Sequence, residues 1–319
     1  GLVAAGGRCA APELCNASQV EFKLGLKTER AVEGQEEAFA NEVIARLEAF
    51  VLQQGAAVEP AFASAGLKLE PDRYVEFWDT PPDVFDIRTH GWIVRHRWRV
   101  PQDGKDKKEK ADLSIKRRSS TDPKVHPEET SKMIVAEGVA VKYAYKQEWI
   151  ASNASQPWSP AHQLYSDFKE DNLVALEALG FHWDGKKHSV GQWGQVVPEL
   201  GKAGNASNLT SPNTLRIVQR EVVLLEDGIF VSASGQRSTF QPSVILWFDE
   251  ADAEPRTAFA GEVTWDMKIE SCTAEAIKSS KDDVFVPLVD FLGDQVDFGA
   301  KTEKAYARMK AELSAAPAH

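Results

Sequence analysis

Residues 91–100 read GWIVRHRWRV, and this stretch carries the strongest indication of the fold. In a β-strand, successive side chains point to opposite faces of the sheet. The alternation therefore places Arg95, Arg97 and Arg99 in a row on one face, with tryptophan and aliphatic side chains on the other. Such a strand has one face to bury and another that needs water or an anionic partner.

Three further stretches alternate in the same way: VEFKLGLK at 20–27, DLSIKRR at 112–118 and GEVTWDMKIE at 261–270. Their apolar faces need a cover, and their polar faces carry charges of both signs. Lys116 and Arg118 share one face of the second stretch, whereas Glu262 and Asp266 share one face of the third. The sequence thus predicts some strands with a cationic face and others with an acidic face.

Hydrophobic periodicity assigns most of the remaining elements. Apolar side chains recur at helical spacing from Gln35 to Gln54, and Gly55 follows as a stop signal. The same spacing predicts a second helix, which carries Leu164, Phe168, Leu173, Leu176 and Leu179, and a third from Lys301 onward. Further strands are expected at 76–85, 142–150, 215–225 and 243–250.

These elements predict an α+β fold, an antiparallel β barrel of about eight strands that forms a tunnel, with helices packed outside. Two interpretations of the polar faces stay open. They are either wetted by solvent and joined by cross-strand ion pairs, or they line a polar interior. Cations on one wall and carboxylates on another would suit a polyanion bound together with a divalent metal ion.

Composition limits the class of protein. The chain of 319 residues is 43% hydrophobic, which is enough apolar material for a core. Its net charge of −11 disfavours nucleic acid or an anionic membrane as a partner. No stretch has the roughly 20 apolar residues of a membrane span. The sequence does not indicate an oligomeric state.

The chain divides into an N-terminal arm at 1–18 and a single domain at 19–319. The arm is small and apolar and shows no periodicity. Within the domain, residues 182–212 are rich in Gly, Asn, Ser and Lys, and they are expected to form an exposed insertion.

Acceptor sequences and cysteines favour a secreted protein or one of the secretory pathway. Four of the seven asparagines lie in N-x-S/T sequons for glycosylation: Asn16, Asn153, Asn205 and Asn208. Cys9 and Cys15 are six positions apart, a spacing that allows a short disulfide and leaves Cys272 unpaired. The alternative is that all three cysteines are free thiols and that the sequons are accidental.

The order of the motifs resembles the CYTH superfamily, the triphosphate tunnel metalloenzymes. This superfamily includes class IV adenylyl cyclases, thiamine triphosphatases and inorganic triphosphatases. Its first strand, E-x-E-x-K, is similar to QVEFK, where Glu21 and Lys23 match and Gln19 replaces the first acid. Its aromatic-D-T-P strand resembles FWDTP at 77–81, and its G-x-x-L-R-x-R strand resembles GWIVRHR at 91–97.

The later motifs follow in the same order, and the resemblance spans residues 19–310. The family's L-x-x-K strand is similar to LSIKRR at 113–118, and KQEW, RIVQRE and WFDEAD match three further strands. In the last acidic strand, E-x-E, Glu262 matches while Thr264 occupies the second acidic position. Asp266 is a candidate substitute two residues further on.

The resemblance implies a set of site residues. The catalytic cations that clamp phosphate oxygens would be Lys23, Arg95, Arg97 and Lys116, with Arg118 and Arg220 as further substrate-binding residues. The ligands of Mg²⁺ or Mn²⁺ would be Glu21, Glu148, Glu262 and Asp266, with Asp249 or Glu250 in support.

The function that the resemblance implies is that of a secreted, metal-dependent phosphohydrolase. It would cleave a phosphoanhydride bond of a triphosphate or polyphosphate, such as tripolyphosphate, inside a charged tunnel. Two alternatives stay open. One is a secreted polyanion-binding protein without catalysis, because Gln19 and Thr264 replace acids of the metal-binding set. The other is an enzyme that uses the same barrel on a different acidic substrate, such as a uronate polysaccharide.

Overall fold

The structure is a computed structural model that describes part of the chain. The described residues are 19–79, 85–100, 112–119, 142–150, 159–169, 215–232, 235, 237–267, 278, 280–298 and 301–315. All four predicted sequons lie outside these residues. So do Cys9 and Cys15, for which a disulfide is predicted, and the whole of the insertion at 182–212.

The strands are β1 (Gln19–Leu26), β2 (Ala57–Glu59), β3 (Leu67–Leu69), β4 (Arg73–Trp78), β5 (Trp92–Arg99), β6 (Asp112–Ser119), β7 (Lys142–Ile150), β8 (Ser159–Lys169), β9 (Ile217–Leu224), β10 (Gly228–Val231), β11 (Arg237–Asp249) and β12 (Ala260–Met267). The helices are α2 (Glu36–Gln53), α3 (Phe62–Ala65), α4 (Asp86–Thr89), η2 (Ser280–Phe285), α10 (Val286–Leu292), η3 (Gly293–Gln295) and α11 (Lys301–Ala315).

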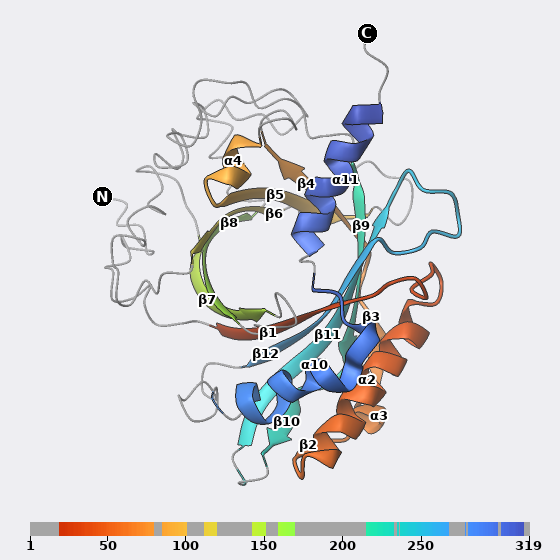
Figure 1. Ribbon diagram of the computed structural model, residues 1–319, viewed down its shortest axis with the longest axis vertical. Helices are drawn as coiled ribbons and strands as arrows, with labels where there is room; N and C mark the ends of the chain where they lie inside the picture. The colour runs from red at the N-terminus through yellow and green to blue at the C-terminus, as the bar shows by residue number, and fades with distance from the viewer. Residues whose placement is uncertain are drawn as a thin grey trace.

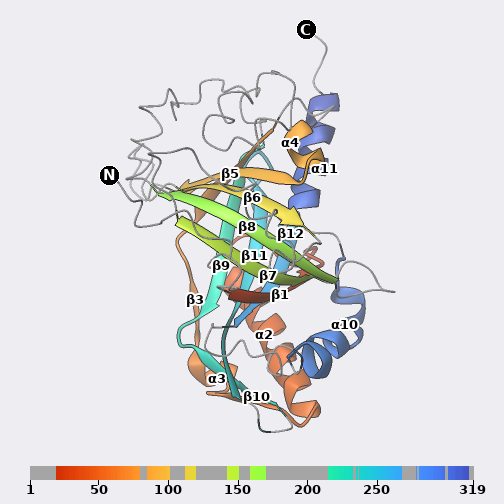
Figure 2. The same ribbon diagram turned by 90° about the vertical axis from the view of Figure 1, so that its left-hand side faces the viewer.

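A closed ring of strands forms the centre of the molecule (Figure 1). Its described strands run in the order β11-β12-β1-β7-β8-β6-β5-β4-β9, and β9 pairs with β11 to close the ring of nine. All these pairs are antiparallel except β1 with β7, which is parallel. Figure 2 shows the ring from the side, as a wall of stacked strands. The predicted antiparallel barrel of about eight strands is therefore confirmed, with one strand more and one parallel pair.

Local sequence explains the first two elements. In β1 the apolar residues from Val20 to Leu26 alternate with Glu21 and Lys23, and the apolar set is buried. In α2 the buried residues recur at helical spacing, and Gly55 follows with a φ of 71°. Glycine adopts this left-handed conformation without the penalty that a Cβ imposes, so the helix ends there.

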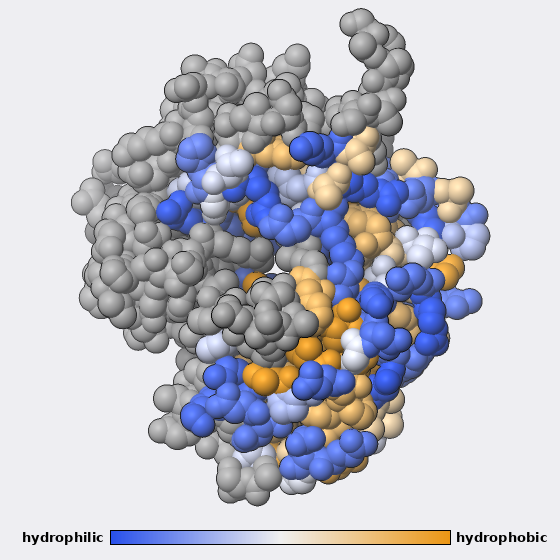
Figure 3. Space-filling model, viewed as in Figure 1, coloured by the Kyte–Doolittle hydropathy of each residue, from blue (hydrophilic) through white to orange (hydrophobic). Residues whose placement is uncertain are grey.

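One hydrophobic core lies between the outer face of the barrel and the helices α2 and α10. Phe22 of β1 stacks on Phe285 with ring centroids 4.2 Å apart, and Trp265 of β12 meets the same ring edge-on at 5.0 Å. Burying each such ring stabilises the fold by about 1.5–3 kcal/mol. In Figure 3, apolar side chains are visible on this side of the molecule where the barrel meets the lower helices, with hydrophilic residues on either side.

A second core lies on the inner face of the barrel, at one end. There Tyr306 and Met309 of α11 pack with Phe77, Ile93 and Trp247. The strand pairing shows that these three residues lie on the inner face, since Phe77 pairs with Arg95, Ile93 with Lys116 and Trp247 with Gln219. The prediction that the helices pack outside therefore holds for α2 and α10 but not for α11, which lies over part of one mouth of the ring (Figure 1).

The second predicted helix is wrong in its first part. Leu164 and Phe168 lie in strand β8, which pairs with both β6 and β7. A spacing of four residues fits an alternating strand as well as a helix, so the positions of Leu164 and Phe168 could not distinguish a strand from a helix. Residues 170–180, which carry the remaining leucines of that pattern, lie outside the described chain.

Candidate functional site

The charged residues predicted for the site on β1, β5, β6, β7 and β12 share the inner face of the barrel. Residues that pair directly across two strands lie on the same face of a sheet, so the register can be followed from strand to strand. Glu21 pairs with Asp266 of β12 and with Glu148 of β7. Around the ring, β8 links β7 to β6, where Ser114 pairs with Arg95 and Asp112 with Arg97. The carboxylates of β1, β7 and β12 therefore face the same interior as the cations of β5 and β6.

Lys23 holds the two buried carboxylates of the acidic wall. Its Nζ lies 2.9 Å from Glu21 Oε2 and 2.7 Å from Glu148 Oε1. Glu21 and Glu148 are only 5% and 0% exposed. Two buried carboxylates on neighbouring strands repel each other, and an ammonium group placed between them offsets that repulsion.

Glu262 is paired with a lysine that the sequence did not indicate. Lys301 Nζ, from the first residue of α11, lies 2.5 Å from Glu262 Oε1 and 4.8 Å from the centroid of the Trp247 ring. Burial lowers the pKa of Lys301, an effect that Glu262 opposes and the nearby charge of Lys23 reinforces. In the sequence Lys301 is one of several charged residues in a predicted polar helix, so nothing there indicated that it contacts Glu262.

Thr264, at the second acidic position of the E-x-E pattern that the sequence resembles, forms a hydroxyl pair with a neighbouring strand. Thr264 is buried, and its Oγ1 lies 2.9 Å from Ser243 Oγ of β11. Thr264 pairs with Lys23 across the strands. A neutral pair therefore stands next to Lys23 where the CYTH pattern has a carboxylate. The side chain of Gln19, the other departure from that pattern, is not among those described.

The cationic wall consists of the arginine row of β5 and its neighbours. Arg95 donates through Nη2 to Ser114 Oγ at 3.3 Å. Along the row, Arg99 pairs with Arg73 of β4, so a fourth arginine joins the same face. Lys116 faces inward beside Ile93. Arg118 has the same parity in β6, but its side chain lies outside the described part.

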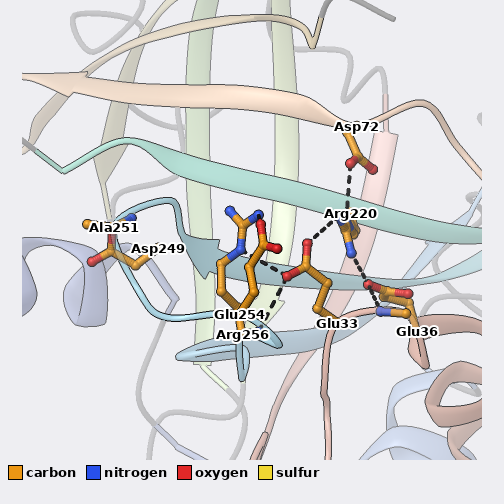
Figure 4. A network of polar contacts seen from close by, with 9 residues as sticks. Glu33, Glu36, Asp72, Arg220, Asp249, Ala251, Glu254 and Arg256 are labelled. Atoms are coloured by element: carbon orange, nitrogen blue, oxygen red, sulfur yellow. Dashed lines mark hydrogen bonds and ion pairs between the residues drawn. The ribbon is translucent and has the colours of Figure 1, made fainter.

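Arg220 lies on the opposite face of the barrel wall. It pairs with Leu246, whereas its neighbour Gln219 pairs with the inward Trp247. Its guanidinium contacts three carboxylates: Nη2 lies 2.8 Å from Glu33, Nε lies 3.2 Å from Asp72, and Nη1 is hydrogen-bonded to Glu36. Figure 4 shows this cluster around Arg220. Arg220 is thus separated by the barrel wall from Arg95, Arg97 and Lys116, which lie on the inner face.

The pKa values of the carboxylates in this cluster depend on burial and on the charges of Arg220 and Arg256. Burial opposes ionisation of Glu33, but its hydrogen bonds with Arg256 and the charge of Arg220 outweigh this and lower its pKa. Burial raises the pKa of Asp72 despite the contact with Arg220. Glu36 is 4% exposed and forms its ion pair at the start of α2. The cluster ties the segment before α2 to the outside of the barrel.

Three further acids of the motifs have structural partners. Asp249 accepts a hydrogen bond of 2.6 Å from Arg308 Nε of α11 and another of 2.9 Å from the backbone N–H of Ala251. Glu250 pairs with Arg216 at 3.2 Å near the surface. Asp79, in the FWDTP motif, accepts from the backbone N–H groups of Ile87 and Arg88 at 2.9 and 3.0 Å. Asp249 therefore anchors α11, and Asp79 stabilises the short helix α4.

The donor chemistry of the acidic wall fits a hard divalent cation. Asp266, Glu21 and Glu148 form one cross-strand row on three neighbouring strands, and carboxylate oxygens are preferred ligands of Mg²⁺ and Mn²⁺. Among the described residues, however, no three acidic, histidine or cysteine side chains are already gathered as a metal site. The candidate ligands Glu21, Glu148 and Asp266 thus share one row by register, while Lys23 and Lys301 are paired with Glu21, Glu148 and Glu262.

No protein-family model matches the chain, and no curated protein matches it in sequence. One similar solved structure is HpAC1 from Hippeastrum, a candidate adenylyl cyclase described as having a dominant triphosphatase activity. It is 15% identical, the alignment covers 91% of this chain and 95% of that one, and the TM-score is 0.36.

Another similar structure is a candidate adenylate cyclase from Bacillus halodurans. It is 9% identical, with 90% of this chain and 97% of that one aligned and a TM-score of 0.36. Among the helices that the structure describes, none is long and apolar enough to span a membrane.

Proposed function

We propose that the barrel binds a linear polyphosphate such as tripolyphosphate and hydrolyses one of its phosphoanhydride bonds with the help of a divalent metal ion. One observation carries the proposal: a single closed ring holds a cationic wall on β5 and β6 and a carboxylate wall on β1, β7 and β12. Phosphate oxygens need cations, and a metal ion bridging to them needs carboxylates. A solvated sheet would not need the two sets to face one interior.

The residues of the cationic wall would bind and orient the substrate. The guanidinium forks of Arg95 and Arg97 hold two phosphate oxygens each, and Lys116 adds a point charge. Together they neutralise charge on the phosphoryl group and keep it in line with the attacking water. Because β5 and β6 are paired strands of a closed barrel, the backbone positions from which these three side chains extend are fixed relative to one another.

The carboxylate wall would hold the metal ion. Glu148, Glu21 and Asp266 are the candidate ligands from one cross-strand row. Glu262 lies four residues from Asp266 along β12, opposite Gly25 and beyond the Thr264–Lys23 pair. A bound Mg²⁺ or Mn²⁺ would supply Lewis acidity toward the phosphate and toward water. Trp247, Tyr306 and Met309 form an apolar cluster at one end of the barrel and would exclude water from the part of the interior that they line.

A substrate screen tests this function. The protein is incubated with tripolyphosphate, nucleoside triphosphates and acidic glycans, each with Mg²⁺, with Mn²⁺ and with a chelator. We expect release of inorganic phosphate from tripolyphosphate that stops when the chelator is added. Turnover of a uronate glycan with no phosphate release would contradict the proposal and favour a different acidic substrate.

A second candidate is a polyanion-binding protein without catalysis. The observation in its favour is the buried Thr264–Ser243 hydroxyl pair at 2.9 Å, which stands where the CYTH pattern has a metal-binding acid. Saturable binding of tripolyphosphate by calorimetry, with no phosphate released in the presence of either metal, would support this candidate over the hydrolase.

The protein is also proposed to be secreted, on the basis of its sequons and cysteines. We expect protein from a secretory host to carry a glycan on at least one of Asn153, Asn205 and Asn208. The measurement is the intact mass before and after enzymatic deglycosylation. A variant with all three changed to Gln is the control and should show no mass shift from these positions. An unchanged mass of the parent after deglycosylation would contradict the proposal that the protein is secreted.

A further inference from the structure

Two lysines inside the barrel are bound to the carboxylates that a metal ion would need. Lys23 lies 2.9 Å from Glu21 and 2.7 Å from Glu148. Lys301 lies 2.5 Å from Glu262, and its side chain is only 14% exposed. Each ammonium group repels a divalent cation and takes up part of the acceptor capacity of its carboxylate, so the metal binds these carboxylates less tightly while the lysines stay where they are.

The same two lysines are suited to an anionic ligand. Each ammonium group carries three donors on a flexible stem, so it can leave a carboxylate for a phosphate oxygen by side-chain rotation alone. For Lys301 the helix itself need not move. Arg308 continues to bind Asp249, and Tyr306 and Met309 continue to pack on Phe77.

We propose that Lys301 and Lys23 are exchangeable counter-ions: an anionic ligand draws the lysines away from Glu262, Glu21 and Glu148, and the released carboxylates then bind the divalent metal. The inference rests on the proposed function, because it requires a polyanion in the barrel. Since coupling between two binding sites is reciprocal, the metal strengthens binding of the anion by the same factor. Metal alone and anion alone are both bound weakly, because each must first break the internal ion pairs.

The exchange predicts opposite effects of one substitution on the two ligands. Lys301→Met keeps an unbranched apolar side chain of similar length, but it removes the ammonium group from Glu262 and from the Trp247 ring. We expect Mn²⁺ to bind this variant roughly tenfold or more tightly than the parent in the absence of anion. Tripolyphosphate, measured in the presence of a chelator, should bind roughly 10 to 150-fold more weakly, because one charge-assisted contact is lost.

The matched control is Lys304→Met. Lys304 lies one turn further along α11 and pairs with Asp297 outside the acidic wall. This variant should bind both ligands as the parent does. Mn²⁺ binding is followed by the loss of free-ion signal in electron paramagnetic resonance, and tripolyphosphate binding is followed by calorimetry, so neither readout depends on turnover.

A second variant tests the exchange from the other side and covers the case in which Lys301→Met does not fold. Glu262→Gln removes the carboxylate but keeps Lys301, so tripolyphosphate should bind more tightly and Mn²⁺ more weakly than in the parent. Unchanged Mn²⁺ affinity in Lys301→Met, with the parent binding tripolyphosphate, overturns the exchange alone. A parent that binds no tripolyphosphate contradicts the proposed function and the exchange together.

Discussion

Arg95→Ala is expected to weaken tripolyphosphate binding, or turnover, by roughly 10 to 150-fold, with the same expected for Arg97→Ala and Lys116→Ala. Each removes a charge-assisted contact to phosphate, worth about 1.5–3 kcal/mol. The melting temperature of the unliganded variants should equal that of the parent or rise slightly. The reason is that each loss relieves repulsion in a row where Arg99 and Arg73 are already direct cross-strand partners. This gain offsets lost contacts such as that of Arg95 with Ser114.

Arg117→Ala is the matched control for this series. Arg117 is the next residue after Lys116, but it lies on the outer face, where its guanidinium is 5.3 Å from the centroid of the Trp92 ring. Its loss should leave ligand binding unchanged. If all three inner-face variants bind tripolyphosphate as the parent does, the cationic wall is a solvated surface and the proposed function is wrong.

Arg220→Ala is expected to lower the free energy of unfolding by about 3–5 kcal/mol, because it removes the partner of the buried Glu36 carboxylate. The side chain is 16% exposed and contacts Glu33, Glu36 and Asp72, of which Glu36 is 4% exposed. Tripolyphosphate affinity of the folded variant should not change, since Arg220 lies on the outer face. Urea unfolding and calorimetry measure the two quantities.

A surface ion pair provides the comparison for stability. Arg30 pairs with Glu42 at 2.6 Å, but its side chain is 71% exposed, so Arg30→Ala should change the free energy of unfolding by less than about 1 kcal/mol. Loss of tripolyphosphate binding in Arg220→Ala, with the stability of the parent retained, would contradict the position of Arg220 outside the barrel.

The faces of the strands could be predicted from sequence because alternation is a local property. Glu21 and Lys23 share a face of β1, and Arg95 and Arg97 share a face of β5, whatever lies around them. The strand β9 lacked this signal, since Val218 and Val222 accompany Arg220 on the outer face while Ile217 lies on the inner one. With apolar residues on both faces, the parity of Arg220 could not be assigned.

The misassigned strand β8 and the unexpected role of Lys301 have a common cause. SPAHQLYSDFK becomes a strand because β6 and β7 pair with it on both sides, and such pairing depends on residues far away in the chain. Lys301 reaches Glu262 because α11 packs on Phe77 and Trp247 at one mouth of the barrel. No spacing within residues 301–315 indicates either neighbour.

The sequence by itself determined which side chains share a face of each strand and where α2 ends, because alternation, helical periodicity and the glycine stop act over a few residues. Only the tertiary structure decided which face became the interior. Pairing of β9 with β11 closes the ring, and closure places the arginines of β5 opposite the carboxylates of β1 and β7 while leaving Arg220 outside. Such long-range pairing is set by burial and hydrogen bonding summed over the whole sheet, so no single stretch of the chain contains it.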